Sequence, residues 1–168
     1  EKAETLRAQR VALVTRAEDF DYKVKGTLGE IAVNEEIYRP VLEALGDHQI
    51  KTVAELEALV KPAGVNFSQL FESIIVLASA GKVAPVQSAD VIEAARPWAA
   101  GLNHHLCLQA RSRSGLNHLA SPMTGGGCVV SRFEKIFMLA IAEGQSTAEE
   151  LAQYAMKLLA SQGQSLTK

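Results

Sequence analysis

The residues best suited to chemistry lie in one short stretch, HLASPMTGGGCVV, where three glycines separate a histidine from a cysteine. A phosphate-binding loop needs a glycine followed four residues later by Gly-Lys-Ser/Thr, and a dinucleotide-binding turn needs Gly-x-Gly-x-x-Gly between a strand and a helix. Gly125, Gly126 and Gly127 satisfy neither pattern. The sequence therefore predicts a structural turn at these glycines, which closes a β-hairpin near residues 118–130.

A metal site is the second chemistry considered for this stretch. The possible ligands are His104, Cys107, His118 and Cys128. His104 and Cys107 share a face on a helix, but His118 and Cys128 lie ten residues apart rather than as a compact zinc-binding pair. We therefore expect polar histidines and buried thiols, with no metal ligand, and leave open whether these four side chains converge.

Nucleophilic catalysis has no more support than metal binding. The chain lacks a Gly-x-Ser-x-Gly elbow, and helical spacing sends His105 and Cys107 to different faces. Pairs of glutamates stand where helices are expected to begin, where the helix dipole favours acids. The sequence predicts no catalytic residue and no cofactor-binding residue, and we expect no binding of S-adenosylmethionine or ATP by this chain.

One charge pattern could serve recognition. No Asp or Glu occurs from residue 94 to residue 133, whereas four arginines lie there. These candidate partner-contact residues are Arg96, Arg111, Arg113 and Arg132. Such a stretch could meet a phosphate or an acidic protein surface, and its alternative is an ordinary solvated face.

Composition limits the remaining possibilities. The chain has 168 residues, 48% of them hydrophobic and 21% charged, with a net charge of −2. This mix is typical of a folded globular protein, and the charge gives no general attraction to nucleic acid or anionic lipid. No apolar run approaches the roughly 20 residues that span a membrane. Two cysteines are too few for a disulfide scaffold, so we expect reduced thiols and a cytoplasmic location.

Hydrophobic spacing predicts the elements that position these residues. Residues 3–17 are predicted as an amphipathic helix, and residues 20–33 as one strand or a short hairpin, which together form an N-terminal part over 1–33. Residues 34–87 then read as three helices and a strand, the order of a winged helix. Predicted helix starts include Asn34 and a capping box formed by Thr52 and Glu55.

The last part, residues 88–168, is predicted to be helical around the hairpin. Pro97 is expected to divide a short helix from a longer one, and Pro40 to bend an earlier helix or delay its start until Arg39. Ser146 and Glu149 are spaced as a second capping box. The predicted fold class is mainly α (α+β), with a winged-helix-like first part and a helical second part that carries a small β-hairpin.

With these residues in view, the chain resembles the methyltransferase regulatory domain, a bacterial module that follows the catalytic domain of certain class I S-adenosylmethionine-dependent methyltransferases. The resemblance is carried by HLASPMTGGGCVVSRFEKIFMLAIAEG, with its small-residue LASP turn before an apolar helix, and by the helix-rich order of residues 34–87 that ends in ASAGKVAPV. Over residues 1–33 only LRAQR is similar to the family.

The resemblance implies a non-catalytic role beside an enzyme. Related full-length proteins methylate protein lysines, and their Rossmann-like domain holds the cofactor. TGGGC is not preceded by an apolar strand that ends in Asp or Glu, so no cofactor contact can be transferred to this chain. The expected partner is a methyltransferase catalytic domain, in cis or in trans, and a protein substrate is a further possibility. The alternative is a winged-helix DNA-binding transcription regulator, and a zinc enzyme ranks last.

Overall fold

The computed structural model describes residues 1–26 and 29–163 and has an α+β fold with small antiparallel sheets. The chain divides into two compact units, unit 1 (Glu1–Ser88) and unit 2 (Ala89–Lys168). The helices of unit 1 are α1 Lys2–Arg7, α2 Glu35–Leu45, α3 Val53–Val60 and α4 Phe67–Ser79, with short 3-10 turns at Ala17–Asp19 and Lys61–Ala63. Its strands are β1 Arg10–Leu13, β2 Lys23–Gly26, β3 Gly29–Ala32, β4 Lys51–Thr52 and β5 Val83–Pro85. Unit 2 contains α5 Ala89–Ala110, β6 His118–Ser121, β7 Gly126–Val129, α6 Arg132–Ala142 and α7 Ala148–Ala160.

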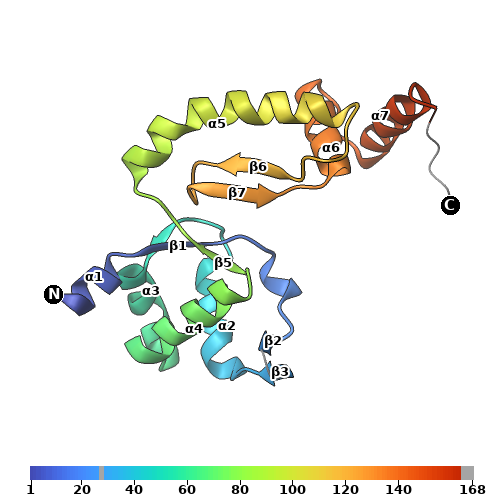
Figure 1. The fold of residues 1–168 in the computed structure, drawn as a ribbon. Coiled ribbons are helices and arrows are strands. Elements are labelled where there is room, and N and C mark those ends of the chain that lie inside the picture. The colour runs from blue at the N-terminus through green and yellow to red at the C-terminus, as the bar shows by residue number, and fades with distance from the viewer. Residues whose placement is uncertain (27–28, 164–168) are drawn as a thin grey trace. The chain divides into compact units, whose positions relative to one another are not determined.

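The centre of unit 1 is a three-stranded antiparallel sheet in the order β4-β1-β5, with α2, α3 and α4 gathered on one side of it (Figure 1). The predicted helix over residues 3–17 is wrong beyond Arg7, because Val11, Ala12 and Leu13 form the middle strand instead. All three are buried. A short apolar run suits a helix and a buried strand equally, and here pairing on both edges selects the strand.

Unit 1 has an extensive apolar core contributed by the sheet and by α2, α3 and α4. Each member is less than a tenth exposed, and the largest include Leu45, Leu56, Leu70, Leu77 and Val41. The three helices followed by β5 confirm the predicted order of residues 34–87. On α3, Leu56 and Val60 are buried in this core, whereas Leu59 is 53% exposed.

Local signals explain where these helices begin. Asn34 accepts a hydrogen bond from the Glu36 amide, and Thr52 and Glu55 form the predicted capping box. The expected delay of α2 until Arg39 is wrong, because the helix runs continuously from Glu35 through Pro40. Proline removes one helical hydrogen bond, and the carbonyl left without its usual donor belongs to an exposed turn, where water can satisfy it.

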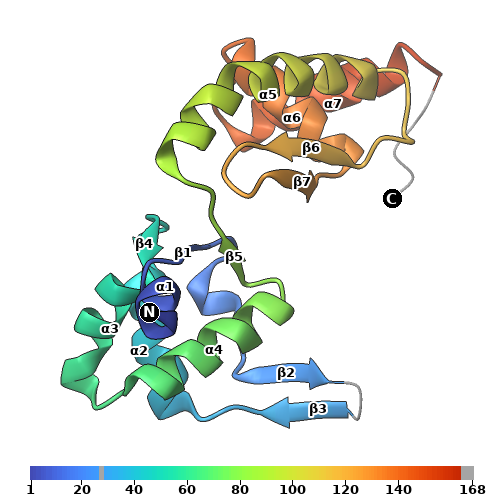
Figure 2. The same ribbon diagram turned by 60° about the vertical axis from the view of Figure 1, so that its left-hand side comes forward.

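Residues 23–32 form a hairpin in which β2 pairs with β3 from Lys23↔Ala32 to Gly26↔Gly29. This is the second of the two alternatives predicted for residues 20–33. Residues 27 and 28, between the two strands, lie outside the described part of the chain. Figure 2 shows this hairpin projecting beside α4. Strand β5 lies at an edge of the three-stranded sheet, where Pro85 is tolerated because an edge strand leaves some backbone N–H groups unpaired.

Unit 2 is built on α5, a single helix of 22 residues. The predicted division at Pro97 is therefore wrong. Figure 2 shows instead that the helix axis changes direction in its first half, which contains Pro97. A proline inside a helix typically bends it, and the residue whose carbonyl loses its donor, Glu93, is exposed.

The predicted second hairpin is present as β6 paired with β7, from His118↔Val129 to Ser121↔Gly126. Strand β6 lies between α5 and β7 in both views of the ribbon (Figures 1 and 2). Asn103 of α5 fixes this order, since its amide donates to the Ala120 carbonyl at 2.8 Å and accepts from the Ala120 amide at 2.7 Å. One side chain thus satisfies both outward-facing backbone groups of the middle of β6.

Polar side chains hold the helices of unit 2 to this hairpin. The ammonium group of Lys135, 1% exposed, donates to the carbonyls of Leu116 and Val130, the latter at 2.9 Å. Leu116 precedes β6 and Val130 follows β7, so one buried lysine ties the open end of the hairpin to α6. The capping box of α7 is formed by Thr147 and Glu150, one residue later than predicted for Ser146 and Glu149.

Candidate partner-binding surfaces

The four arginines predicted to contact a partner have different surroundings. Arg132 donates to the Ala110 carbonyl at 2.9 Å and to the Arg111 carbonyl at 3.0 Å, so it joins α6 to the end of α5. Arg96 and Arg113 are exposed. Arg96 lies about 22 Å along α5 from Arg111, given the helical rise per residue. The structure therefore brings Arg111 and Arg132 together and leaves Arg96 apart from them.

Arg111 is part of a polar cluster at the meeting of α5, α6 and α7. Its guanidinium donates to the carboxylate of Glu143 and, at 2.7 Å, to the hydroxyl of Tyr154. The Tyr154 hydroxyl donates to the same carboxylate at 2.9 Å. Burial, together with the hydrogen bond to Glu143, raises the pKa of Tyr154. The sequence pattern identified an arginine-bearing stretch, but two of its members serve the internal packing of unit 2.

The candidate metal ligands do not gather. Cys107 is buried, whereas Cys128 is exposed on β7, and His104 and His118 are exposed. Within residues 1–26 and 29–163, no three His, Cys, Asp or Glu side chains are grouped so that they could hold a metal ion. Burial raises the pKa of the Cys107 thiol, the opposite of what an activated nucleophile requires.

The triple glycine divides between a turn and a strand. Gly125, with φ of 69°, ends the turn in the left-handed conformation that glycine adopts at little cost. Gly126 and Gly127 belong to β7 and are not in that conformation. The prediction of a glycine turn therefore applies to Gly125, and the other two glycines begin the second strand.

The largest exposed apolar side chain lies on the first half of α5. Trp98 is 81% exposed, and Val91 and Leu102 are 45% and 50% exposed. Because these positions are seven and four residues apart, they form one stripe along the helix. We call Val91, Trp98 and Leu102 the α5 stripe. Sequence reasoning missed it because the predicted break at Pro97 split the three positions between two helices.

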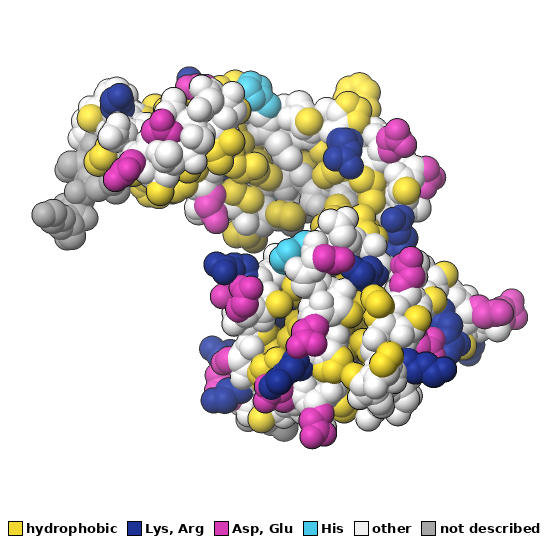
Figure 3. Space-filling model, turned by 180° about the vertical axis from the view of Figure 1, so that it is seen from behind, with side chains coloured by type: hydrophobic (Ala, Val, Ile, Leu, Met, Phe, Trp, Pro, Cys, Tyr) yellow, Lys and Arg dark blue, Asp and Glu magenta, His cyan; other side chains and the backbone are white. Residues whose placement is uncertain are grey.

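Apolar exposure extends beyond this helix. In the view from behind, hydrophobic side chains spread over the elements of unit 2 (Figure 3). Exposed members on α6 and α7 include Met138, Ile141 and Met156, each between 48% and 58% exposed. Clustered apolar exposure of this kind marks surfaces that contact other proteins.

Unit 1 contains a groove of about 410 Å³ between the β2–β3 hairpin, α2 and α4. Its apolar wall includes Val24, Ile31, Ile37 and Val76. Tyr38 lies at its base, and burial, with a smaller contribution from the charge of Glu72, raises the pKa of that phenol. The lining also includes the polar residues Lys25, Asn34, Gln69, Glu72, Ser73 and Ser79, so the groove has a mixed polar and apolar wall.

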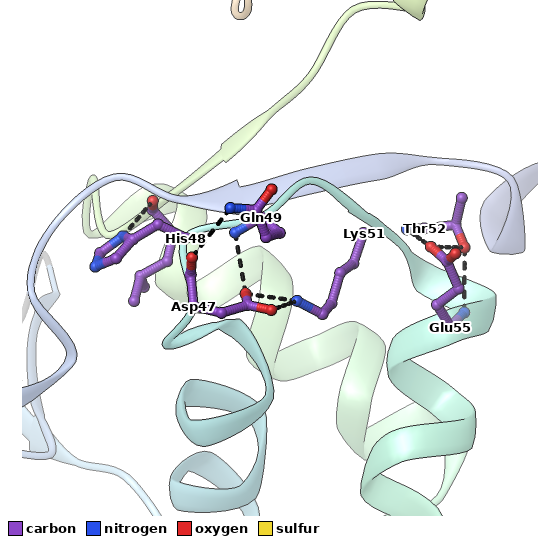
Figure 4. Close-up of polar contacts among 7 residues, drawn as sticks. Asp47, His48, Gln49, Lys51, Thr52 and Glu55 are labelled. Carbon is purple, nitrogen blue, oxygen red and sulfur yellow. Dashed lines mark hydrogen bonds and ion pairs between the residues drawn. The ribbon is translucent and has the colours of Figure 1, made fainter.

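A polar loop joins α2 to β4 (Figure 4). The Asp47 carboxylate accepts hydrogen bonds from the Lys51 ammonium at 2.5 and 2.6 Å and from the Gln49 amide at 3.0 Å. The bond to Lys51 is the main reason that the pKa of Asp47 is lowered. These contacts shape the segment that leads into β4.

His48 closes the same loop against the neighbouring strand. Its backbone has φ of 57°, and its Nδ1 lies 3.2 Å from the carbonyl oxygen of Leu13. Because a carbonyl can only accept, this contact places a proton on Nδ1. The hydroxyl drawn in this cluster, that of Thr52, is bonded to Glu55 and lies away from His48 (Figure 4). We therefore assign it a structural role in the entry to β4.

Comparison with known proteins gives one informative match. The chain is 27% identical over 159 residues to the uncharacterized protein sll1526 of the cyanobacterium Synechocystis sp.. The matched region covers 95% of this chain but 30% of that protein, so the chain spans less than a third of the length of the curated relative it matches. No family model matches the chain, and no solved structure matches it.

Proposed function

We propose that the chain is a non-catalytic accessory module that packs on the catalytic domain of an S-adenosylmethionine-dependent methyltransferase and modulates its activity or its access to substrate. The observation that carries the proposal is the match of nearly the whole chain to less than a third of a longer protein. A segment that recurs within a longer chain is typical of a module. The resemblance of residues 118–144 to the methyltransferase regulatory domain supplies the kind of enzyme.

The arrangement of unit 1 supports a winged-helix-like fold within this proposal. Three helices with short strands β4 and β5, and a sheet on one side of them, correspond to the helices and the sheet of a winged helix. The middle strand comes from β1, on the N-terminal side of the helices, and β5 leads into α5 without a further strand. This arrangement leaves no wing hairpin after the third helix.

The α5 stripe is the surface that we assign to contact with the catalytic domain. An exposed tryptophan flanked by aliphatic side chains is the kind of anchor that dominates protein–protein interfaces. The stretch from residue 94 to residue 133 carries Arg96 but no acid. Arg96 is two residues before Trp98 and therefore projects from another face of the helix, so the complementary surface is expected to be mainly apolar.

The experiment uses the longer Synechocystis relative, divided into the matched segment and the remainder. Calorimetry tests whether the remainder binds S-adenosylmethionine, and a methylation assay measures its activity with and without the matched module. We expect cofactor binding by the remainder and a change in activity when the module is added. A remainder that binds no S-adenosylmethionine contradicts the methyltransferase assignment.

The single tryptophan of this chain provides a direct probe of contact. Docking should move the Trp98 emission to shorter wavelength, because the exposed indole leaves water. Trp98→Ala should weaken the association by more than about tenfold, the size typical of an aromatic hot spot. Val14→Ala, at a side chain of unit 1 that is 45% exposed, is the matched control and should leave the affinity unchanged.

The DNA-binding alternative has less support. Helix α4 occupies the place of a recognition helix, and its sequence FSQLFESIIVLAS contains no Lys or Arg. Non-specific affinity for DNA grows with the number of phosphates neutralised, so such a helix gains almost none of it. An anisotropy titration at low salt should show no binding, whereas tight, salt-sensitive binding lost on changing Gln69 and Lys82 would favour the alternative.

None of the helices in the described residues is both long and apolar enough to cross a membrane.

Elemental analysis of the purified chain should find well below one equivalent of zinc. A full equivalent that is lost together with the fold on changing Cys107 or Cys128 would restore the metal-site interpretation.

A further inference from the structure

The outer edge of β7 differs from the other strand edges of the molecule. In the part of the chain that the structure describes, β7 pairs with β6 alone. Asn103 satisfies the outward-facing groups of Ala120 in the middle of β6, whereas the described residues provide no such partner for Gly127 and Val129 of β7. Backbone donors and acceptors along such an edge are a template for another strand.

The register identifies which backbone groups face outward. In an antiparallel pair, hydrogen-bonded and non-hydrogen-bonded positions alternate. The backbone of Ala120 bonds to Asn103, so Ala120 and its partner Gly127 form a non-hydrogen-bonded pair, whose N–H and C=O groups point away from the facing strand. His118 and Val129 form the next such position. The N–H and C=O groups of Gly127 and Val129 therefore point outward, and those of Cys128, between them, point toward β6.

Neither the backbone conformation nor the packing within this chain requires glycine at positions 126 and 127 of β7. Neither Gly126 nor Gly127 has a positive φ. A side chain at Gly126 would meet nothing within 4 Å, and one at Gly127 would make an ordinary contact of 3.5 Å with the His118 ring. A glycine in a strand often marks the close approach of another backbone.

The edge also lacks the devices that prevent pairing. Residues 118–131, HLASPMTGGGCVVS, contain no Asp, Glu, Lys or Arg. In contrast, the β2–β3 hairpin carries Lys23, Lys25 and Glu30, and charged side chains are what natural proteins use to block edge pairing. An edge without like charges can meet a copy of itself without repulsion.

We propose that β7 pairs with β7 of a second copy of this chain, antiparallel and about a two-fold axis at Cys128. Gly127 and Val129 of one copy then exchange hydrogen bonds with Val129 and Gly127 of the other. The Val129 side chain, 77% exposed in the single chain, lies opposite a glycine each time and fills the space that the missing side chain leaves. The same fit occurs twice by symmetry, which favours a second copy over an unrelated strand.

The proposed pairing makes a sharp prediction for Cys128. The two Cys128 residues form a non-hydrogen-bonded pair with Cα atoms about 4.5 Å apart. A disulfide needs Cα atoms about 4.4–6.8 Å apart, so this pair can be joined without moving the backbone. Strands of four residues bury far less than the about 1,200 Å² of a stable interface, so we expect weak, reversible association that an oxidant can trap.

The experiment treats the whole chain with diamide, which takes two electrons and two protons from a pair of thiols and is itself reduced to a hydrazine. We expect a disulfide-linked dimer on a non-reducing gel. It should be lost in Cys128→Ser and kept in Cys107→Ala, because Cys107 is buried. Sedimentation velocity without oxidant should show a concentration-dependent shift toward a dimer.

The decisive control moves the thiol by one residue. In Cys128→Ser combined with Val129→Cys, the thiol takes a highly exposed position, but the two copies of residue 129 lie about 8 Å apart in the proposed register. Cross-linking should be slower by at least about tenfold, since that separation exceeds the reach of a disulfide. Equal or faster cross-linking would mean random collision and would overturn the proposal.

A second pair of variants tests the edge without changing any cysteine. Val129→Glu should reduce the yield of the Cys128 cross-link several-fold, because the substitution removes the apolar fit and brings like charges together. Ile31→Glu makes the same change at a 59% exposed position of the other hairpin and should leave the yield unaltered. A chain that sediments as a monomer at all concentrations and gives no cross-link contradicts the pairing.

Discussion

Units 1 and 2 reach stability by different means. Unit 1 surrounds its sheet with a large apolar core in which Leu45, Leu56, Leu70 and Leu77 are fully buried. In unit 2 the cluster of mutually packed apolar side chains is small, consisting of Cys107, Leu119 and Leu139 with two partly buried neighbours. Side-chain hydrogen bonds to backbone from Asn103, Arg132 and Lys135 take over part of that role.

The difference between the two cores is matched by a difference in the number of apolar side chains that each unit exposes. Among the described residues, large apolar side chains are exposed at four positions of unit 1 and at ten positions of unit 2, where Trp98 and Ile141 are 81% and 58% exposed. A fold that is held by hydrogen bonds to its backbone can keep apolar side chains available for another protein. Unit 2 is therefore the part of the chain better suited to docking.

The largest effect is expected from the core of unit 1. Leu70→Ala should lower the free energy of unfolding by about 2–5 kcal/mol, because it removes a fully buried side chain and leaves a cavity. Ile75→Ala on the same helix, at a 54% exposed position, should cost less than about 0.5 kcal/mol. Urea denaturation measures both, and hydrogen exchange should locate the Leu70→Ala effect within residues 1–88. Equal effects would mean that α4 is not buried as described.

The matching test of unit 2 removes a charge rather than a core side chain. Lys135→Met keeps the length of the side chain but leaves the carbonyls of Leu116 and Val130 without their donor, at a cost of about 1–3 kcal/mol. Lys157→Met, at an exposed position of α7, is the control and should be neutral. Hydrogen exchange should show faster exchange in the β6–β7 hairpin. If Lys135→Met is as neutral as its control, the hydrogen bonds of the lysine do not hold the hairpin.

A smaller effect distinguishes two adjacent residues at the start of α7. Thr147→Ala should cost about 1 kcal/mol, because Thr147 accepts from the Glu150 amide in the capping box. Ser146→Ala should cost clearly less, since only the Ser146 backbone makes a short contact, at 2.8 Å to Glu150. Thermal unfolding of the two variants gives the comparison. The reverse order would restore the cap predicted from the sequence.

The smallest expected difference between the units is in their response to acid. Arg7 lowers the pKa of Glu57 in unit 1, and hydrogen bonds from Ser146 and Thr147 lower the pKa of Glu150 in unit 2. A lowered pKa stabilises the folded state above the ordinary glutamate value of 4.5, and this contribution is lost as the pH falls through the folded-state pKa. Both units should therefore lose stability below about pH 4.5, as measured by urea midpoints across pH.

Acid sensitivity has an internal control. Glu57→Gln should reduce the pH dependence of unit 1 and leave that of unit 2 unchanged, with hydrogen exchange separating the two. A change confined to unit 2 would contradict the assigned contact between Arg7 and Glu57.

Elements with strong local signals were predictable from the sequence. The cap at Asn34, the box at Thr52 and the β6–β7 hairpin have residue types that determine backbone geometry within a few positions, whereas residues 20–33 were predicted only as one strand or a short hairpin. Residues 10–13 were not predictable, because their partners in β4 and β5 lie far along the chain. Pro97 misled the prediction, since a bend at an exposed turn is tolerated in a long helix.

The candidate surfaces were less predictable than the fold. The arginines of residues 94–133 share one acid-free stretch of the sequence, but Arg111 and Arg132 interact within unit 2. Which arginines bond to other residues of unit 2 depends on how α5, α6 and α7 pack, and the local sequence pattern does not predict that packing. The α5 stripe required the helix to be continuous, so it could be recognised only after the position of Pro97 was known.

The place of β1 in unit 1 affects how that unit is made. Val11 pairs with Lys51 on one side and with Pro85 on the other, and β4 and β5 are neighbours only through it. During synthesis the middle strand leaves the ribosome first, and its second partner follows 74 residues later. Contacts at such sequence separation slow folding, so the sheet of unit 1 should be among the last parts to form in a nascent chain. A nascent chain that has emerged only as far as residue 82 holds three helices and an apolar strand paired along one edge, and its other edge is open to chaperones.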